Sequence, residues 1–546
     1  MKKSFTFGAI LLGMLINGLL GLVEAQFVPD APEPLPSLQG TLFLHGGGVV
    51  DSAMRARFTD LAGGEDARIV VIPTADLSDP LSAKKLDVWR EQQPRSVEFL
   101  HVESRKQIPE SDFEDLLSNA TAVWFSGGKQ SRLVEIYAGT PVEAAVMKLL
   151  ARGGVVGGTS AGTAIASKIM LVYESERTGF DFLPGAIVDQ HFFARKRTDR
   201  LRHAVDLHPD HVGFGIDEKT ALIVRGRTLE VIGDSNVFIA IAASADRAAR
   251  TEILKPGARA DLIALRRSAQ SRQTTAFPAK EVVAPKLERG SLFIAGGGRL
   301  SDEAIQEFVR LAGSDQSRIV YVPCSEEKAI LEEPSMVRTL LKAGAKQVDW
   351  IHTKDRASAN DPSFSAKLAT ATGVWFGGGR QWNFVDSYQN TESHRLMHQV
   401  LERGGVIGGS SAGASIQGDY MPRGDPMGNT QIMAEGYERG LGFLSGVAID
   451  QHFTQRNRFS DMARLKKTFP QLLGIGIDEG TYMIVEQSQA KIMGAGQVAF
   501  FDRSIGSKDV EAYTSVAAGQ VYDLASRAFQ ILELPGPAQP VKPRVE

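Results

Sequence analysis

The strongest constraint on the fold of this chain is an internal duplication, in which the same short motifs occur twice in the same order. The turn Gly157–Gly162 (GGTSAG) returns as Gly408–Gly413 (GGSSAG), and Asp-Gln-His-Phe occurs at 189–192 and again at 450–453. Four further pairs match: Thr41–Gly48 with Ser291–Gly298, Ile69–Pro73 with Ile319–Pro323, Val123–Gln130 with Val374–Gln381, and Gly213–Thr220 with Gly474–Thr481. The chain therefore contains two copies of one domain, and the second has a longer stretch between its serine and its histidine.

The order of elements within each copy predicts an α/β fold. Short apolar, β-branched runs alternate with amphipathic segments such as 141–152, which is typical of a parallel sheet with helices on both faces. Each copy then ends in strand-rich sequence, at 221–242 and at 482–501. We expect this architecture twice in tandem.

Each repeated serine is placed like a catalytic nucleophile. Apolar residues precede the turn and small, helix-compatible residues follow it, which predicts a strand, a sharp turn and a helix around Ser160 and Ser411. Glycines permit the turn, and backbone N–H groups beside the serine can stabilise an oxyanion. The alternative is a purely structural strand–helix connection, and the duplication favours the catalytic interpretation.

A histidine follows each serine at the end of a predicted strand. His191 comes after Ala186–Val188 and His452 after Val447–Ile449. A neutral histidine in that position can act as a general base on the serine. A hydrogen-bonded core histidine is the alternative, but the repeated Asp-Gln-His context favours a functional role.

Length, net charge and cysteine content exclude several classes of protein. The chain has 546 residues, too many for one core, and a net charge of −3, which gives no reason to expect nucleic-acid binding. Cys324 is the only cysteine, so neither an intrachain disulfide nor a cysteine metal cluster can form, and we interpret it as a packing residue. We expect no metal or organic cofactor.

The N-terminus has the pattern of a secretory signal. Lys2 and Lys3 precede an apolar run, and we predict cleavage after Ala25; retention as a membrane anchor is the alternative. The mature protein is then expected to be exported, to the periplasm or the medium, and free of the membrane. We predict a signal peptide at 1–25, a proline-rich leader at 26–38, domains at 39–266 and 290–535, a linker at 267–289 and a tail at 536–546.

Taken together, the motifs resemble cyanophycinase and its relatives among the dipeptidase E-type serine peptidases. The relevant segments are Gly-Gly-Thr-Ser-Ala-Gly, Phe-x-Gly-Gly-x-Gln, Asp-Gln-His-Phe-x-x-Arg-x-Arg and Gly-Ile-Asp-Glu. The resemblance implies a flavodoxin-like fold similar to class I glutamine amidotransferases, with serine in place of cysteine. It also implies cleavage next to aspartate, and for cyanophycinase the release of β-Asp-Arg from an arginine-bearing polyaspartate.

The resemblance assigns roles in the first copy. It implies Ser160 as nucleophile, His191 as base, and a glutamate between them, for which we prefer Glu174 over Glu176. The implied substrate-binding residues are Gln130, Asp189, Gln190, Arg195, Arg197 and Arg200. We expect the oxyanion hole at Gly128 and Ala161. The alternative for the arginines is a solvated basic helix face.

The second copy matches in part. Ser411 and His452 correspond to the catalytic pair, and Gly379 and Ala412 to the oxyanion hole. The matching substrate-binding residues are Gln381, Asp450, Gln451, Arg456 and Arg458. Asp461 stands in place of the third arginine, and no glutamate aligns with the third member of the triad, although Asp425, Asn429 and Glu435 are near in sequence.

The sequence thus predicts a serine peptidase acting on a peptide or polyaspartate substrate. One alternative is an isoaspartyl or Asp-X dipeptidase, and another is a tandem binding protein without catalysis. An amidotransferase-like partner that delivers ammonia suits the serine poorly. We also expect the two copies to pair as a pseudo-dimer within the chain.

Overall fold

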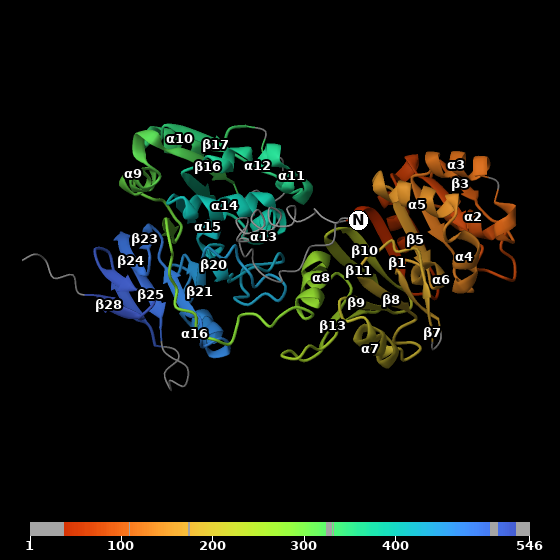
Figure 1. The fold of residues 1–546 in the computed structure, drawn as a ribbon. Helices are drawn as coiled ribbons and strands as arrows, with labels where there is room; N and C mark the ends of the chain where they lie inside the picture. Colours follow the sequence, from red (N-terminus) through yellow and green to blue (C-terminus); the bar gives the residue numbers. More distant parts are fainter. Residues whose placement is uncertain are drawn as a thin grey trace, which may run out of the picture. The chain divides into compact units, whose positions relative to one another are not determined.

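The computed structural model describes residues 38–530 apart from 109, 173–174, 324–329, 331 and 503–511. The described residues form two compact units (Figure 1). The first unit comprises 38–280 together with 422–438, and the second comprises 281–421 and 439–530. The predicted signal peptide, the tail, Cys324 and Glu174 lie outside the described residues.

Two sheets form the framework of the first unit. The larger has eight strands in the order β14-β11-β10-β1-β5-β4-β2-β3, and the smaller has the order β13-β12-β9-β8. Their strands are β1 Leu38–His45, β2 Arg68–Ile72, β3 Ser96–Phe99, β4 Ala122–Phe125, β5 Val155–Thr159, β8 Ala186–Gln190, β9 Val212–Ile216, β10 Thr220–Gly226, β11 Thr228–Gly233, β12 Val237–Ile241, β13 Arg250–Leu254 and β14 Arg259–Asp261. A separate hairpin pairs β6 Ile169–Val172 with β7 Ser175–Thr178.

The predicted parallel sheet with helices on both faces is confirmed. Strands β1 to β5 of the larger sheet pair in parallel, and β10, β11 and β14 extend it in antiparallel fashion. The helices are α1 Ser52–Leu61, α2 Lys84–Arg90, α3 Glu110–Asn119, α4 Gln130–Tyr137, α5 Pro141–Ala151, α6 Ala161–Ala164, α7 Thr198–Leu207 and α8 Leu262–Ser271.

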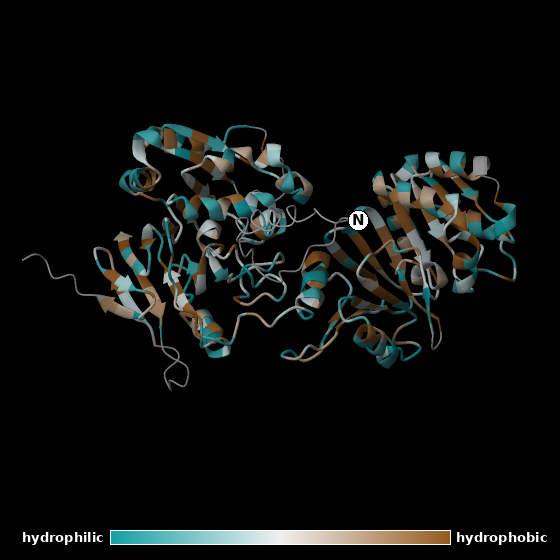
Figure 2. Cartoon of the chain, in the orientation of Figure 1, coloured by the Kyte–Doolittle hydropathy of each residue, from teal (hydrophilic) through white to brown (hydrophobic). Residues whose placement is uncertain are grey.

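Alternation along the strands explains the two layers of helices. In β1, Leu42 and Leu44 face the core formed with α3, α4 and α5, whereas Phe43 faces the core formed with α1 and α2. Because successive side chains of a strand point to opposite faces, a fully apolar strand needs cover on both sides. In Figure 2 the strands of this unit are largely brown, and α2 and α7 are largely teal.

The second unit repeats this plan. Its sheets have the orders β17-β16-β18-β19-β15-β23-β24-β27-β28 and β20-β21-β22-β25-β26. The strands are β15 Ser291–Ala295, β16 Arg318–Val322, β17 Gln347–Trp350, β18 Gly373–Phe376, β19 Val406–Ser410, β20 Gly418–Tyr420, β21 Leu444–Gln451, β22 Leu473–Ile477, β23 Thr481–Glu486, β24 Gln489–Gly494, β25 Gln497–Phe501, β26 Thr514–Ala517, β27 Val521–Asp523 and β28 Ala528–Gln530. The helices are α9 Asp302–Leu311, α10 Ser335–Lys342, α11 Arg356–Asn360, α12 Pro362–Ala369, α13 Trp382–Tyr388, α14 Glu392–Glu402, α15 Ala412–Ser415 and α16 Phe459–Thr468.

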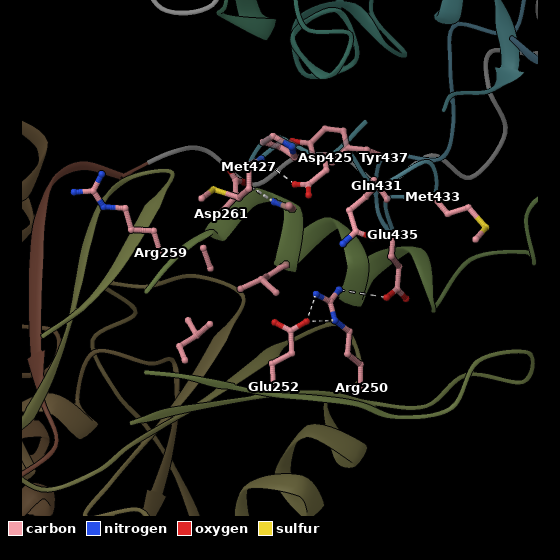
Figure 3. Close-up of a pocket in the computed structure, with 16 residues that line it drawn as sticks. Arg250, Glu252, Arg259, Asp261, Asp425, Met427, Gln431, Met433, Glu435 and Tyr437 are labelled. Carbon is pink, nitrogen blue, oxygen red and sulfur yellow. Dashed lines mark hydrogen bonds and ion pairs between the residues drawn. The ribbon is translucent and has the colours of Figure 1, made fainter. Parts of the chain in front are cut away.

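Two features of the chain differ from the predicted domain boundaries. The expected linker at 267–289 begins inside α8, whose Arg267 is buried and donates a hydrogen bond to the carbonyl of Gly436. The segment 422–438, which lies between Ser411 and His452 in sequence, packs as part of the first unit. Figure 3 shows Glu435 of this segment paired with Arg250, whose Nη1 is 3.5 Å from the Glu435 Oε2, in the wall of a cavity of about 430 Å³.

None of the helices in the described ranges has the length and apolar character needed to cross a bilayer.

Candidate active site

The turn after β5 holds Ser160 in a backbone conformation that few side chains adopt. Its φ is 52° and its ψ is −105°, and Ser411 has nearly the same values, 57° and −114°. Glycines make this turn possible, because a Cβ at Gly158 would lie 2.5 Å from the backbone of Gly162. The predicted strand, sharp turn and short helix are therefore present, and such strain is typical of a nucleophile elbow.

His191 lies against the serine at the end of β8. Its Nε2 is 2.8 Å from the Ser160 Oγ, and its backbone N–H donates to the carbonyl of Gly46 at 2.6 Å. A Cβ at Gly47 would lie 2.2 Å from the Cε1 of the imidazole, so only glycine leaves room for the ring. The glycines after β1 therefore pack directly against the imidazole ring of His191.

A glutamate completes the hydrogen-bonded chain, but it is not the predicted one. The Glu218 Oε1 is 2.7 Å from the His191 Nδ1. Because β8 and β9 are adjacent parallel strands, their carboxyl ends place His191 and Glu218 side by side. The preference for Glu174 is corrected by this contact, since both ring nitrogens of His191 are already engaged. Glu176 pairs instead with His208, at 2.9 Å.

The second unit contains the same arrangement. His452 places its Nε2 2.9 Å from the Ser411 Oγ and its Nδ1 2.5 Å from the Glu479 Oε1. Glu479 follows β22 as Glu218 follows β9. Glu479, rather than Asp425, Asn429 or Glu435, contacts the second ring nitrogen of His452. Glu435 forms an ion pair with Arg272 at 2.6 Å within the first unit.

The environment keeps both histidines in the form that accepts a proton. Burial lowers the pKa of His191 below 6.5, and this outweighs the hydrogen bond that the ring donates to Glu218, which raises the pKa. The pKa of His452 is lowered for the same reason, with Glu479 opposing. Each imidazole is therefore neutral at neutral pH and can take the serine proton.

Two of the three arginines predicted to bind substrate form ion pairs inside the first unit. The buried carboxylate of Asp189 pairs with Arg197 at 3.1 Å and with the Nε of Arg200 at 3.0 Å. These arginines hold the loop after β8 rather than pointing freely at a ligand. Arg195 is exposed, pairs with no described carboxylate, and is close enough to His191 to lower its pKa.

The predicted glutamines join the same network. The Gln190 amide donates to the Gln130 Oε1 at 2.9 Å, and Gln130 in turn donates to the carbonyl of Leu171 at 2.6 Å. Gln130 and Gln190 are thus linked directly, and Arg197 links Gln190 to Asp189.

The second unit has a reduced version of this network. Arg458 pairs with Asp450 at 2.6 Å, both side chains being buried with Gln381 and Gln451. Asp461, in place of the third arginine, forms a surface pair with Arg464. Arg456 is exposed, as Arg195 is. The substitution at Asp461 therefore removes a partner of the buried aspartate, which differs from the expected loss of a substrate ligand.

The glycine turn after β4 lies beside the nucleophile. A Cβ at Gly127 would be 3.5 Å from the Ser160 Cβ, and one at Gly378 would be 4.0 Å from the Ser411 Oγ. Gly128 and Gly379 follow at positive φ, where a side chain would be strained. These turns and the first residues of α6 and α15, Ala161 and Ala412, lie next to Ser160 and Ser411. Within the described ranges, no cluster of three acidic, histidine or cysteine side chains could hold a metal.

Both copies are similar in sequence to known proteins. The model of "Peptidase family S51" matches residues 42–232 and 292–493. Cyanophycinase from Geminocystis herdmanii is 34% identical over 197 residues, which is 34% of this chain and 72% of that protein. Cyanophycinase from Nostoc sp. is 32% identical over 229 residues, covering 41% and 76%. A solved peptidase from an acI-B1 Actinobacterium is 24% identical with a TM-score of 0.34, covering 41% of this chain and 98% of its own.

Proposed function

Because this chain belongs to peptidase family S51 and is a serine-type peptidase, we propose that it hydrolyses aspartyl or β-aspartyl peptide bonds through an acyl-enzyme. The observation that carries the proposal is the hydrogen-bonded chain from Ser160 through His191 to Glu218, repeated by Ser411, His452 and Glu479. Each set of three hydrogen-bonded residues contains a nucleophile, a base and a carboxylate that orients the base, and acyl transfer requires these three groups.

The proposed reaction begins with proton transfer from the Ser160 Oγ to the His191 Nε2. The serine oxygen attacks the scissile carbonyl, and the backbone N–H groups of Gly128 and Ala161 stabilise the oxyanion. The imidazolium, held by Glu218, then protonates the leaving amine as the C–N bond breaks. Water, deprotonated by the same histidine, hydrolyses the ester and restores the serine.

The substrate is proposed from the relatives and from the charge near each histidine. The curated relatives named above are cyanophycinases, and Arg195 and Arg456 offer one exposed guanidinium at each site. A guanidinium suits a substrate carboxylate, which it can bind by paired hydrogen bonds. We therefore propose cyanophycin as one substrate, with β-Asp-Arg as the product.

The test is release of β-Asp-Arg from cyanophycin by the unmodified protein, Ser160→Ala and Ser411→Ala. Loss in one variant identifies the working site, and partial loss in both indicates two working sites. Absence of release by the unmodified protein, together with hydrolysis of short aspartyl peptides, would reject cyanophycin as substrate. Absence of both activities would reject the proposed function.

An isoaspartyl or Asp-X dipeptidase is a second candidate, favoured by the state of the arginines. Arg197 and Arg200 are engaged by Asp189, so a single exposed arginine remains from the predicted cluster of the first unit. One guanidinium fits a substrate with one free carboxylate better than a long polymer that carries a carboxylate on every repeat. Rates for β-aspartyl and α-aspartyl dipeptides, measured beside the polymer, separate the two candidates.

We further propose that the protein is exported and cleaved after Ala25. The support is the basic start and apolar run at residues 2–23. Determination of the N-terminal residue of protein recovered from outside the cytoplasm tests this, with Gln26 as the expected first residue. A retained Met1 would contradict cleavage.

A further inference from the structure

We infer that the active site of the second unit has an added specificity pocket, which receives an apolar substrate residue with a free carboxylate beside the scissile bond. The inference rests on the proposed function and names the substrate class of one of its two sites. A cavity of about 540 Å³ opens between α9, α10 and β16, which lie together in Figure 1. Its volume is in the range of small-molecule sites.

The cavity reaches the residue that precedes the nucleophile. Gly378 and Ser410 form part of its wall, and Ser410 immediately precedes Ser411. A Cβ at Gly378 would lie 4.0 Å from the Ser411 Oγ, so this wall borders the reacting serine. A group held in the cavity therefore belongs to a residue next to the bond that Ser411 attacks.

Part of the cavity wall is apolar. Ile305 and Trp375 are buried, and Leu300 and Met336 are half-buried against them. Such a surface favours an aliphatic or aromatic side chain, because contact removes apolar area from water on both partners.

Two basic side chains line the cavity beside this apolar surface. Arg299 follows β15 and Lys342 ends α10; both are exposed, and neither side chain pairs with a carboxylate of the described residues. Asp302 is the one acidic residue among the described residues that line the cavity. The excess positive charge favours a substrate carboxylate next to the apolar group.

The equivalent positions of the first unit differ in charge and in bulk. Ile305 and Lys342 correspond to Arg55 and Glu91, which form an ion pair at 3.7 Å, and Arg299 corresponds to Val49. The described residues at these positions thus offer no unpaired cation.

Bulk at a neighbouring buried position also differs. Leu340 corresponds to Trp89, whose ring centroid lies 4.9 Å from that of Trp124, the counterpart of Trp375. The indole ring of Trp89 therefore fills space beside Trp124 that the smaller Leu340 does not fill beside Trp375. The two sites are therefore built for different neighbours of the scissile bond.

The test uses Ser160→Ala protein, in which only the second site can act, with β-Asp-Leu and its C-terminal amide as substrates. Arg299→Val with Lys342→Glu introduces the residues of the first unit. We expect kcat/KM for β-Asp-Leu to fall about ten- to hundredfold through KM, because a charged hydrogen-bonded contact is lost. The rate for the amide should change less than about threefold. Lys346→Glu, an exposed lysine outside the cavity, is the matched control.

Binding of β-Asp-Leu to protein lacking both serines separates this inference from the proposed function. One calorimetric binding step that disappears with Arg299→Val and Lys342→Glu supports the pocket even where no hydrolysis is seen. Unchanged binding and unchanged KM would overturn the pocket while leaving hydrolysis by Ser411 intact. An equal loss for acid and amide would also overturn it.

Discussion

At the scale of single residues, the sequence predicted the serine and the histidine of each hydrogen-bonded Ser-His-Glu arrangement but not the glutamate. Ser160 and His191 were found because local patterns place both at strand ends. Glu218 reaches His191 through pairing of β8 with β9, a contact that spacing along the chain does not reveal. A signal did exist, since Glu218 and Glu479 each follow their histidine by 27 residues within a repeated Gly-Ile-Asp-Glu segment.

Replacement of Glu218 tests its role at the first site. In a Ser411→Ala background, Glu218→Gln should lower kcat by about 10³- to 10⁴-fold, because the imidazolium loses its counter-charge and its tautomer is no longer fixed. Glu176→Gln, which removes the partner of His208, should leave the rate unchanged. Full activity of Glu218→Gln would remove this residue from the triad.

The pH profile gives a second prediction. Burial lowers the pKa of His191, so the acid limb of kcat/KM for the first site should have its midpoint below pH 6.5. Glu218 raises that pKa, so the residual activity of Glu218→Gln should have its midpoint at still lower pH. A midpoint that moves upward would contradict this assignment of charges.

The arginines differ in their expected effects on stability. Arg200→Ala leaves the buried Asp189 with one arginine fewer and should destabilise the first unit by about 1–3 kcal/mol, seen as a lower Tm. Arg195→Ala should raise KM for aspartyl substrates and leave Tm unchanged, because its side chain is exposed and unpaired among described residues. Thermal unfolding and steady-state kinetics of both variants test this. A lower Tm for Arg195→Ala and an unchanged Tm for Arg200→Ala would contradict the assignment.

At the scale of elements, the alternating pattern predicted the parallel sheet and its two layers of helices, as β1 illustrates. The pattern did not predict that each copy divides its strands between two sheets, with the histidine and the glutamate on the smaller one. That division depends on which strands pair across loops, and apolar runs of similar length give no preference among partners.

The glycine loop after β1 supports the histidine through close approach. Gly47→Ala should lower activity at the first site about a hundredfold with little loss of folding, because a Cβ 2.2 Å from the imidazole must displace it. Gly63→Ala is the control, since its φ of 113° is close to the 118° of Gly47 and its Cβ would meet nothing nearer than 3.8 Å. Equal effects of the two substitutions would attribute the loss to backbone strain alone.

At the scale of the whole molecule, the sequence showed that the domain is duplicated. It did not show that a segment of the second copy, 422–438, which lies between Ser411 and His452 in sequence, packs with the first unit. There Glu435 forms ion pairs with Arg247, Arg250 and Arg272, and Figure 3 shows its pair with Arg250. An acidic residue in a loop gives no indication of which distant arginines it will meet. The predicted pseudo-dimer stays a prediction, which small-angle scattering tests.

Glu435→Gln should loosen this segment. Removing the charge leaves the nearly buried Arg272 without its carboxylate, at a cost of about 3–5 kcal/mol. Amide hydrogen exchange within 425–437 should rise markedly. Glu252→Gln, which alters a more exposed partner of Arg250, should have a small effect. Unchanged exchange in Glu435→Gln would show that the ion pairs do not hold the segment.

The most direct test of the account is hydrolysis of an aspartyl substrate by four proteins: the unmodified chain, Ser160→Ala, Ser411→Ala and the double variant. The account predicts that the double variant loses serine-dependent hydrolysis and that at least one single variant retains it. Both serines lie within hydrogen-bond distance of a histidine that a glutamate orients. Hydrolysis that persists in the double variant at the rate of the unmodified chain would contradict the central claim.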